Sequence, residues 1–130
     1  MPQGRVRVLI VDDHELVREG LKALLSRDPA IDVVGEASTG LEALELVPRV
    51  LPDVALMDLR MPVMDGAEAT ARIRDAYPRV QVVILSGAGD SALAKAALEG
   101  GAVSYLIKDA RHDALTRAIH EAASGAAGTP

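Results

Sequence analysis

The sequence contains no cysteine, tryptophan or phenylalanine, and its only tyrosines are Tyr77 and Tyr105. Without cysteine, the chain cannot form a disulfide framework, a thiolate zinc site or a cysteine nucleophile, and this composition is typical of a reducing compartment. With so few aromatic rings, we do not expect a surface that stacks the bases of single-stranded nucleic acid. The core must therefore be built from aliphatic and methionine side chains.

Long apolar runs and excess positive charge are also missing. The apolar runs are far shorter than a membrane span, and residues 1–7 lack the apolar segment of a signal peptide. Lysine and arginine total 14 against 19 aspartates and glutamates, a net charge of -5, so the chain repels phosphate backbones on average. The 130 residues suffice for one ordinary domain. We predict a cytoplasmic domain that itself contacts neither membrane nor nucleic acid.

Five short aliphatic runs alternate with five stretches of helix length. Continuous runs rich in β-branched residues are typical of strands buried on both faces. They predict strands at residues 6–11, 31–35, 54–57, 80–85 and 105–107. This alternation predicts an α/β fold with a parallel sheet and helices on both faces. The domain is expected to occupy residues 1–123, and the small, polar residues 124–130 are expected to form a flexible tail or the start of a linker.

Local signals place the ends of the helices. Thr39 with Glu42, and Asp65 with Glu68, have the spacing of capping boxes, in which a side-chain oxygen accepts from the first turn. Pro48 and Pro52 are expected to follow the second helix, because proline lacks the N–H that a continuing helix uses.

Polar side chains follow four of the predicted strands. Asp12 and Asp13 come after the first, Asp58 after the third, Ser86 after the fourth and Lys108 after the fifth. Because the carboxyl ends of parallel strands meet at one edge, we expect these groups to converge. Three neighbouring carboxylates raise one another's pKa unless a cation lies among them, and an oxygen-only ligand set favours Mg²⁺. A hydroxyl and an ammonium beside them indicate phosphoryl transfer to an aspartate.

Each of these residues also has an ordinary structural interpretation when taken alone. Asp12 with Glu15 has capping-box spacing, and the other polar residues at this edge would serve equally as turn residues or solvated groups. The three histidines, His14, His112 and His120, are interpreted as solvated side chains rather than as metal ligands or phosphohistidines. Only the combination of the strand-end residues favours the chemical interpretation.

The segments "VLIVDDHELVREGL", "DVALMDLRMPVMDG", "VVILSG" and "SYLIKD" resemble the receiver domain of bacterial two-component response regulators of the NarL/FixJ type. The resemblance extends from residue 5 to about residue 123. It implies a flavodoxin-like (CheY-like) doubly wound sheet of five parallel strands in the order 2-1-3-4-5.

The resemblance also implies the roles of the acidic residues. Asp58 corresponds to the phosphoacceptor, Asp13 to a direct Mg²⁺ ligand and Asp12 to a ligand acting largely through water. The backbone carbonyl of Arg60 corresponds to a third protein ligand, beside the two carboxylates of Asp13 and Asp58.

Further positions correspond to the phosphoryl contacts and the switch. Ser86 and Lys108 would contact the phosphoryl group, Ser86 would move toward it, and Tyr105 would be the aromatic residue that turns inward. Two positions depart from the pattern: Asp109 follows the lysine where many relatives have proline, and Ser104 stands where glycine is usual. The cis or trans state of the bond between Lys108 and Asp109 stays open.

The resemblance implies a phosphorylation-activated switch rather than a conventional turnover enzyme. A sensor histidine kinase would phosphorylate the domain, which would catalyse its own phosphorylation and dephosphorylation, and the family allows a homodimer. Relatives normally continue into a helix-turn-helix domain that binds DNA and regulates transcription. The alternatives are a stand-alone receiver acting through protein contacts, a Mg²⁺-dependent phosphohydrolase, and a degenerate interaction module.

Overall fold

The sheet contains five parallel strands in the order β2-β1-β3-β4-β5. The structure, a computed structural model, describes residues 4–87, 89–108 and 112–125. The strands are β1 (Val6–Val11), β2 (Ile31–Ala37), β3 (Val54–Asp58), β4 (Gln81–Ser86) and β5 (Ser104–Ile107). The predicted fold class and strand order are confirmed.

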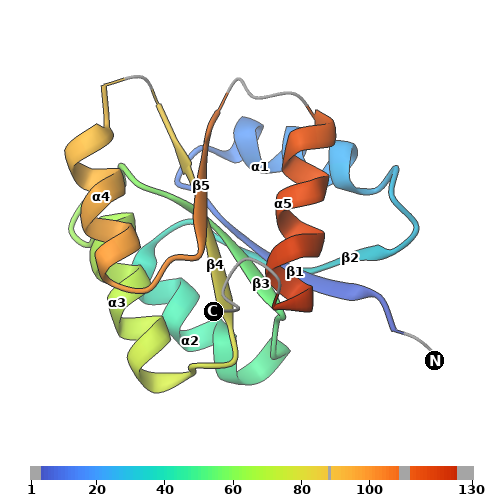
Figure 1. Ribbon diagram of the computed structural model, residues 1–130, viewed down its shortest axis with the longest axis horizontal. Helices are drawn as coiled ribbons and strands as arrows, with labels where there is room; N and C mark the ends of the chain where they lie inside the picture. Colours follow the sequence, from blue (N-terminus) through green and yellow to red (C-terminus); the bar gives the residue numbers. More distant parts are fainter. Residues whose placement is uncertain (1–3, 88, 109–111, 126–130) are drawn as a thin grey trace.

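Helices cover both faces of this sheet (Figure 1). They are α1 (Glu15–Leu25), α2 (Gly40–Val50), α3 (Gly66–Ala76), α4 (Ser91–Glu99) and α5 (His112–Ser124). Figure 1 shows α2, α3 and α4 on one side of the sheet and α1 and α5 on the other. No helix within the described ranges combines the length and the apolar character that crossing a bilayer requires.

The two faces of the sheet form two separate cores. Along β1, Leu9 and Val11 belong to the core under α2, α3 and α4, whereas Val8 and Ile10 belong to the core under α1 and α5. All four side chains are at most 1% exposed, and burying one such side chain contributes about 2 kcal/mol. Because both faces are covered, the strands read as continuous aliphatic runs, as the sequence predicted.

The two predicted capping residues begin their helices. Thr39 Oγ1 accepts a hydrogen bond from the Glu42 N–H at 3.0 Å at the start of α2. Asp65 Oδ1 accepts from the Glu68 N–H at 2.9 Å at the start of α3. Each bond satisfies a backbone donor that has no partner within its helix.

The prediction for Pro48 is wrong, because it lies inside α2, which continues to Val50, whereas Pro52 follows the helix as predicted. Proline removes one donor but has a helical φ, so the last turn is retained. The helix ends at Leu51, which has a left-handed φ of 50° and donates its N–H to the Val47 carbonyl at 2.9 Å. The Arg7 side chain donates to the terminal carbonyls of Val50, at 2.6 Å, and Leu51, which stabilises this end.

Two predicted strand ends move by one residue toward the functional edge. Asp58 and Ser86 are the last residues of β3 and β4 rather than the first residues after them. The reason is ladder pairing, since Asp58 pairs with Leu85 and Ser86 pairs with Ile107. Both polar residues are therefore held by the sheet itself.

The carboxyl-terminal boundary also differs slightly from expectation. Ser124, the first residue of the predicted tail, is the last residue of α5. Residues 126–130 and Asp109 lie outside the described residues.

Candidate functional site

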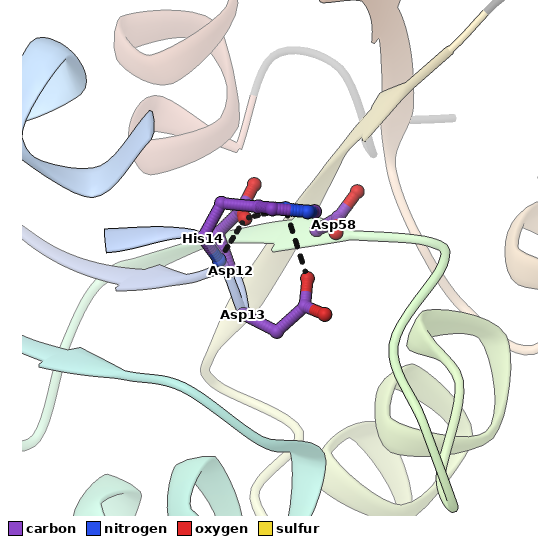
Figure 2. A group of neighbouring side chains, drawn as sticks. All are labelled: Asp12, Asp13, His14 and Asp58. Carbon is purple, nitrogen blue, oxygen red and sulfur yellow. Dashed lines mark hydrogen bonds and ion pairs between the residues drawn. The ribbon is translucent and has the colours of Figure 1, made fainter. Parts of the chain in front are cut away.

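Three aspartates from two strands meet at the carboxyl edge of the sheet. One carboxylate oxygen each from Asp12, Asp13 and Asp58 lies, together with a ring nitrogen of His14, within a group whose atoms are all within 4.8 Å of one another. Figure 2 shows these four side chains around the ends of β1 and β3. The structure thus brings together the three aspartates that the strand ends predicted and adds His14.

Lys108 supplies the positive charge nearest to these carboxylates. Its Nζ lies 3.0 Å from Asp58 Oδ1 and 3.1 Å from Asp12 Oδ2. Burial acts to lower the pKa of Lys108, but the hydrogen bond with Asp58 and the negative charges of Asp58 and Asp12 outweigh it and raise that pKa. The ammonium therefore stays charged and screens the repulsion between the two aspartates.

The Asp58 carboxyl is buried beside two other acidic side chains. Its side chain is 5% exposed, and burial is the main reason that its pKa is raised above the ordinary value. The hydrogen bond from Lys108 opposes this rise, whereas the negative charges of Asp12 and Asp13 add to it. A bound cation would relieve both the burial penalty and the repulsion.

Several buried oxygens at this edge are not satisfied by the protein. Among the described residues, Asp58 Oδ2 has no hydrogen-bond partner. Asp12 Oδ2 and Asp13 Oδ1 lie within ion-pair distance of Lys108 and His14 but have no partner with hydrogen-bond geometry. Buried carboxylate oxygens without donors are what a hard divalent cation binds, so the donor set fits Mg²⁺.

Asp12 does not cap α1, so the capping-box interpretation of Asp12 with Glu15 is wrong. The residue that precedes the helix is His14, whose side chain makes no cap bond. Asp12 Oδ1 instead accepts the His14 N–H at 2.8 Å, and Arg18 Nη1 donates to the Asp12 carbonyl at 2.7 Å. These bonds fix the turn after β1 and leave Asp12 Oδ2 facing Lys108.

A charged cluster behind this turn was not predicted from the sequence. Glu36 on β2 accepts from Arg18 Nε and from Lys22 Nζ, both at 2.7 Å. The hydrogen bond from Lys22, followed by that from Arg18, lowers the pKa of Glu36. The cluster ties α1 to β2 and so holds Arg18 against the Asp12 carbonyl. Its members are far apart in sequence, and no local motif joins them.

Ser86 and Lys108 are joined through the backbone. Ser86 is 3% exposed, and its carbonyl accepts the Lys108 N–H at 2.8 Å. Pairing of β4 with β5 therefore fixes the position from which the lysine side chain reaches Asp58. Tyr105, on the same strand β5, is 47% exposed. The roles of Ser86 and Tyr105 in a switch remain predictions.

Arg60 contributes a side-chain contact in addition to its predicted backbone role. Its Nε forms a short hydrogen bond with Asp90 Oδ1, and Asp90 Oδ2 accepts the Gly87 N–H at 2.9 Å. The Arg60 bond is the main cause of the lowered pKa of Asp90, and the Gly87 bond acts in the same direction. Asp90 thus links the loops after β3 and β4. Its position just before α4 is a helix-start signal that the sequence interpretation did not use.

His14 and His120 are exposed, as expected for solvated side chains, and each also lies beside a carboxylate. His14 Nδ1 lies 3.2 Å from Asp12 Oδ1 and 3.1 Å from Asp13 Oδ1, and His120 Nε2 lies 2.8 Å from Asp28 Oδ2. Sequence neighbours could not reveal the pair of His120 with Asp28, which joins α5 to the loop before β2. The His112 side chain lies outside the described part of the chain.

Gly66 allows α3 to begin directly against the end of β3. A Cβ atom at this position would lie 2.2 Å from the Asp58 carbonyl oxygen and 2.8 Å from Leu59 Cα. The Gly66 N–H also donates to the Leu59 carbonyl at 2.8 Å. Only glycine fits this approach, which holds the backbone beneath the Asp58 carboxylate.

Comparison with known proteins gives a family assignment for this fold and site. The family model of the response regulator receiver domain matches residues 8–120. The transcriptional regulatory protein DegU of Brevibacillus brevis is 40% identical over 96% of this chain and 53% of its own length. The probable transcriptional regulatory protein NarL of Mycobacterium tuberculosis is 42% identical over 93% of this chain and 56% of its own length. The chain therefore spans about half the length of the curated relatives it matches.

Solved structures agree with this assignment. The signal receiver domain of the putative response regulator NarL from Mycobacterium tuberculosis superposes with a TM-score of 0.88 at 41% identity, covering 95% of this chain and 99% of that one. The response regulator domain of Thermotoga maritima CheB gives a TM-score of 0.85 at 32% identity, covering 92% of this chain and 97% of that one. The chain belongs to the response regulator receiver domain family and is similar to receivers of NarL- and DegU-type transcriptional regulators.

Proposed function

We propose that this domain accepts a phosphoryl group on Asp58 from a sensor histidine kinase, in a reaction that requires Mg²⁺. The observation that carries the proposal is the state of the Asp58 carboxylate. It is buried at the carboxyl edge of the sheet, one oxygen contacts Lys108, and the other has no hydrogen-bond partner among the described residues. An oxygen without a donor keeps its lone pairs available for attack on phosphorus.

The residues that would hold Mg²⁺ are Asp12, Asp13 and Asp58, together with the backbone carbonyl of Arg60. Asp13 would bind directly and Asp12 largely through water, because Mg²⁺ retains several of its waters in protein sites. When bound, Mg²⁺ supplies the positive charge that offsets both the carboxylates and an incoming phosphoryl group.

The transfer itself uses the chain's own groups. An Asp58 oxygen forms a bond to phosphorus while the phosphorus–nitrogen bond of the kinase phosphohistidine breaks, and the histidine nitrogen retains that electron pair. Lys108 stabilises the negative charge on the transferred group, and the Ser86 hydroxyl donates to one of its oxygens. Later attack of water on phosphorus releases inorganic phosphate and regenerates the Asp58 carboxylate.

The new charge then biases a conformational equilibrium. Ser86 moves toward the phosphoryl group, and Tyr105, now half exposed on β5, turns inward into the space that this movement leaves. The surface formed by α4, β5 and α5 changes as a result and controls partner binding, including a homodimer.

We place this receiver in the cytoplasm, where it controls a carboxyl-terminal helix-turn-helix domain that binds DNA and regulates transcription. Two facts support this: the relatives are named as transcriptional regulators, and the chain corresponds to about half of their length. The acidic receiver itself does not bind DNA. A stand-alone receiver that acts through protein contacts is the alternative.

The test is phosphorylation of the purified chain by acetyl phosphate, followed by intact mass spectrometry. With Mg²⁺ we expect one added phosphoryl group, and without Mg²⁺ we expect none. Asp58→Asn should abolish the addition, whereas Asp53→Asn, at the opposite end of β3, should retain it. An unmodified wild-type mass with Mg²⁺ present, or modification that persists in Asp58→Asn, contradicts the proposal.

A further inference from the structure

His14 presents its imidazole to the acidic site, although the proposed magnesium chemistry gives this ring no role. Its Nδ1 lies 3.2 Å from Asp12 Oδ1 and 3.1 Å from Asp13 Oδ1, and the dashed lines of Figure 2 mark its contacts with these two residues. Atoms of all three residues and of Asp58 lie within 4.8 Å of one another. The ring is therefore within reach of any ion that binds between the carboxylates.

An independent feature indicates that this space is built for an ion. The Asp58 side chain is only 5% exposed, and its Oδ2 has no partner in the described part of the chain. The Asp12 side chain is 1% exposed, and within the described residues its Oδ2 has no hydrogen-bond partner and lies in ion-pair contact with Lys108. Buried oxygens of this kind require a donor or a cation.

The distances around the imidazole nitrogen fit shared coordination. Two ligand atoms about 2.1 Å from one metal ion lie about 3.0 Å apart at right angles and about 3.4 Å apart in a tetrahedron. The two distances from His14 Nδ1, 3.2 Å and 3.1 Å, fall between these values. The Nδ1 contact with Asp12 Oδ1 has the geometry of a hydrogen bond, and the similar distance to Asp13 Oδ1 places all three atoms around a position that an ion could share.

We propose that His14 is a nitrogen ligand that raises the affinity of this site for first-row transition-metal ions relative to Mg²⁺, strongly for Ni²⁺ and more weakly for Mn²⁺. Imidazole suits Ni²⁺ well and binds Mn²⁺ less strongly, whereas Mg²⁺ prefers oxygen and gains little from nitrogen. The inference rests on the proposed location of the magnesium site and deepens it by naming a residue that sets metal selectivity. Nickel is expected to bind more tightly than manganese, following the general order of stability for nitrogen and oxygen ligands.

The direct test is pulsed electron paramagnetic resonance of Mn²⁺ bound to the chain. We expect the hyperfine coupling of a directly bound histidine nitrogen in the wild type. The coupling should persist in the control His120→Gln, whose histidine pairs with Asp28 instead, and should disappear in His14→Gln. Because the His14 side chain is 64% exposed, its replacement leaves the core intact. Absence of nitrogen coupling in the wild type, or its persistence in His14→Gln, overturns the proposal.

Calorimetry supplies a second, quantitative measurement. His14→Gln should lower the ratio of Ni²⁺ affinity to Mg²⁺ affinity by about 10-fold to 100-fold, the scale on which single residues tune metal sites. His120→Gln should leave this ratio at the wild-type value, and an unchanged ratio in His14→Gln contradicts the inference. Failure of the proposed function looks different, since wild type would then neither bind Mg²⁺ nor gain mass with acetyl phosphate.

Discussion

The two ends of strand β3 carry the same residue type in opposite environments. At the amino end, Asp53 is exposed and its Oδ2 accepts the Arg7 N–H at 2.9 Å. At the carboxyl end, Asp58 is buried, crowded by Asp12 and Asp13, and has one oxygen without a partner among the described residues. At the amino end, the carboxylate therefore satisfies a backbone N–H of the neighbouring strand. At the carboxyl end, part of the carboxylate charge stays unsatisfied.

Backbone strain does not distinguish these ends. Each has a non-glycine residue with positive φ, Leu51 at 50° before β3 and Val63 at 71° after it. What differs is whether the charged groups are satisfied by the protein. Unsatisfied negative charge held by a rigid sheet is costly in the empty state and becomes favourable only when a cation binds.

The largest expected effect on stability comes from replacing a glycine with alanine at each end of the sheet. Gly66→Ala forces a Cβ against the Asp58 carbonyl and should destabilise the domain by at least about 3 kcal/mol and displace the phosphoacceptor. Gly101→Ala, at the amino end with φ 118°, should cost about 2 kcal/mol but leave phosphorylation of the folded fraction intact. Urea unfolding and mass spectrometry after acetyl phosphate treatment measure the two effects. If Gly66→Ala were phosphorylated like wild type, the proposed difference between the carboxyl and amino ends would be contradicted.

Removing the cation of the carboxyl end should have the next largest effect. Lys108→Met leaves Asp12 and Asp58 without their shared partner and should lower the free energy of unfolding by about 2 kcal/mol without Mg²⁺. Mg²⁺ should restore most of this loss by replacing the lost charge. Arg7→Met at the amino end should cost about 1 kcal/mol, and Mg²⁺ should not restore it. Thermal unfolding with and without Mg²⁺ measures these effects. If Mg²⁺ stabilised both variants equally, the proposed difference between the two ends would be contradicted.

Acidification should produce a smaller effect that is specific to Asp58. Burial raises the pKa of this carboxyl in the folded state, so the folded chain holds the proton more tightly than the unfolded chain. Stability conferred through Asp58 therefore rises as the pH falls from neutrality through the raised pKa toward the ordinary value. Asp58→Asn should be more stable than wild type at neutral pH without Mg²⁺, and the gap should narrow on acidification. A gap that widens as the pH falls would contradict this sign.

The smallest expected effect concerns the bridge between two loops of the carboxyl end. Arg60→Ala removes the partner of Asp90, and because the Arg60 side chain is 70% exposed the loss should be only about 0.5 kcal/mol. The Gly87 N–H donates a hydrogen bond to Asp90, and its hydrogen exchange should become faster in this variant. The Arg7 N–H at the amino end should exchange at the wild-type rate. Unchanged exchange at Gly87 would show that Asp90 holds this loop without Arg60.

Local signals in the sequence predicted much of the fold. Aliphatic runs gave the strands to within two residues at each end, and Thr39 and Asp65 were identified as caps because their bonds span only three residues. The effect of Pro48 was misinterpreted because the side chain that stabilises the end of α2 belongs to Arg7, on strand β1. Signals confined to one turn were reliable, whereas those that depend on a distant partner were not.

The candidate site shows the same division. Strand ends predicted that Asp12, Asp13, Asp58 and Lys108 would meet, because parallel strands share one carboxyl edge. The sequence did not predict the clusters of Arg18 with Glu36 or of Arg60 with Asp90, since these pairs join separate elements. Nor did it predict that His14 would face the aspartates.

The sequence by itself determined the alternation of strands and helices, the aliphatic core and the edge at which charged groups collect, because each depends on composition, periodicity or chain direction. Only the tertiary structure decided which of those charges are satisfied. Asp53 and Asp58 are the same residue type at the two ends of one strand, and neighbours from other elements leave the first solvated and bury the second. The free energy of a charge depends on what surrounds it, and that is settled only when distant parts of the chain come together.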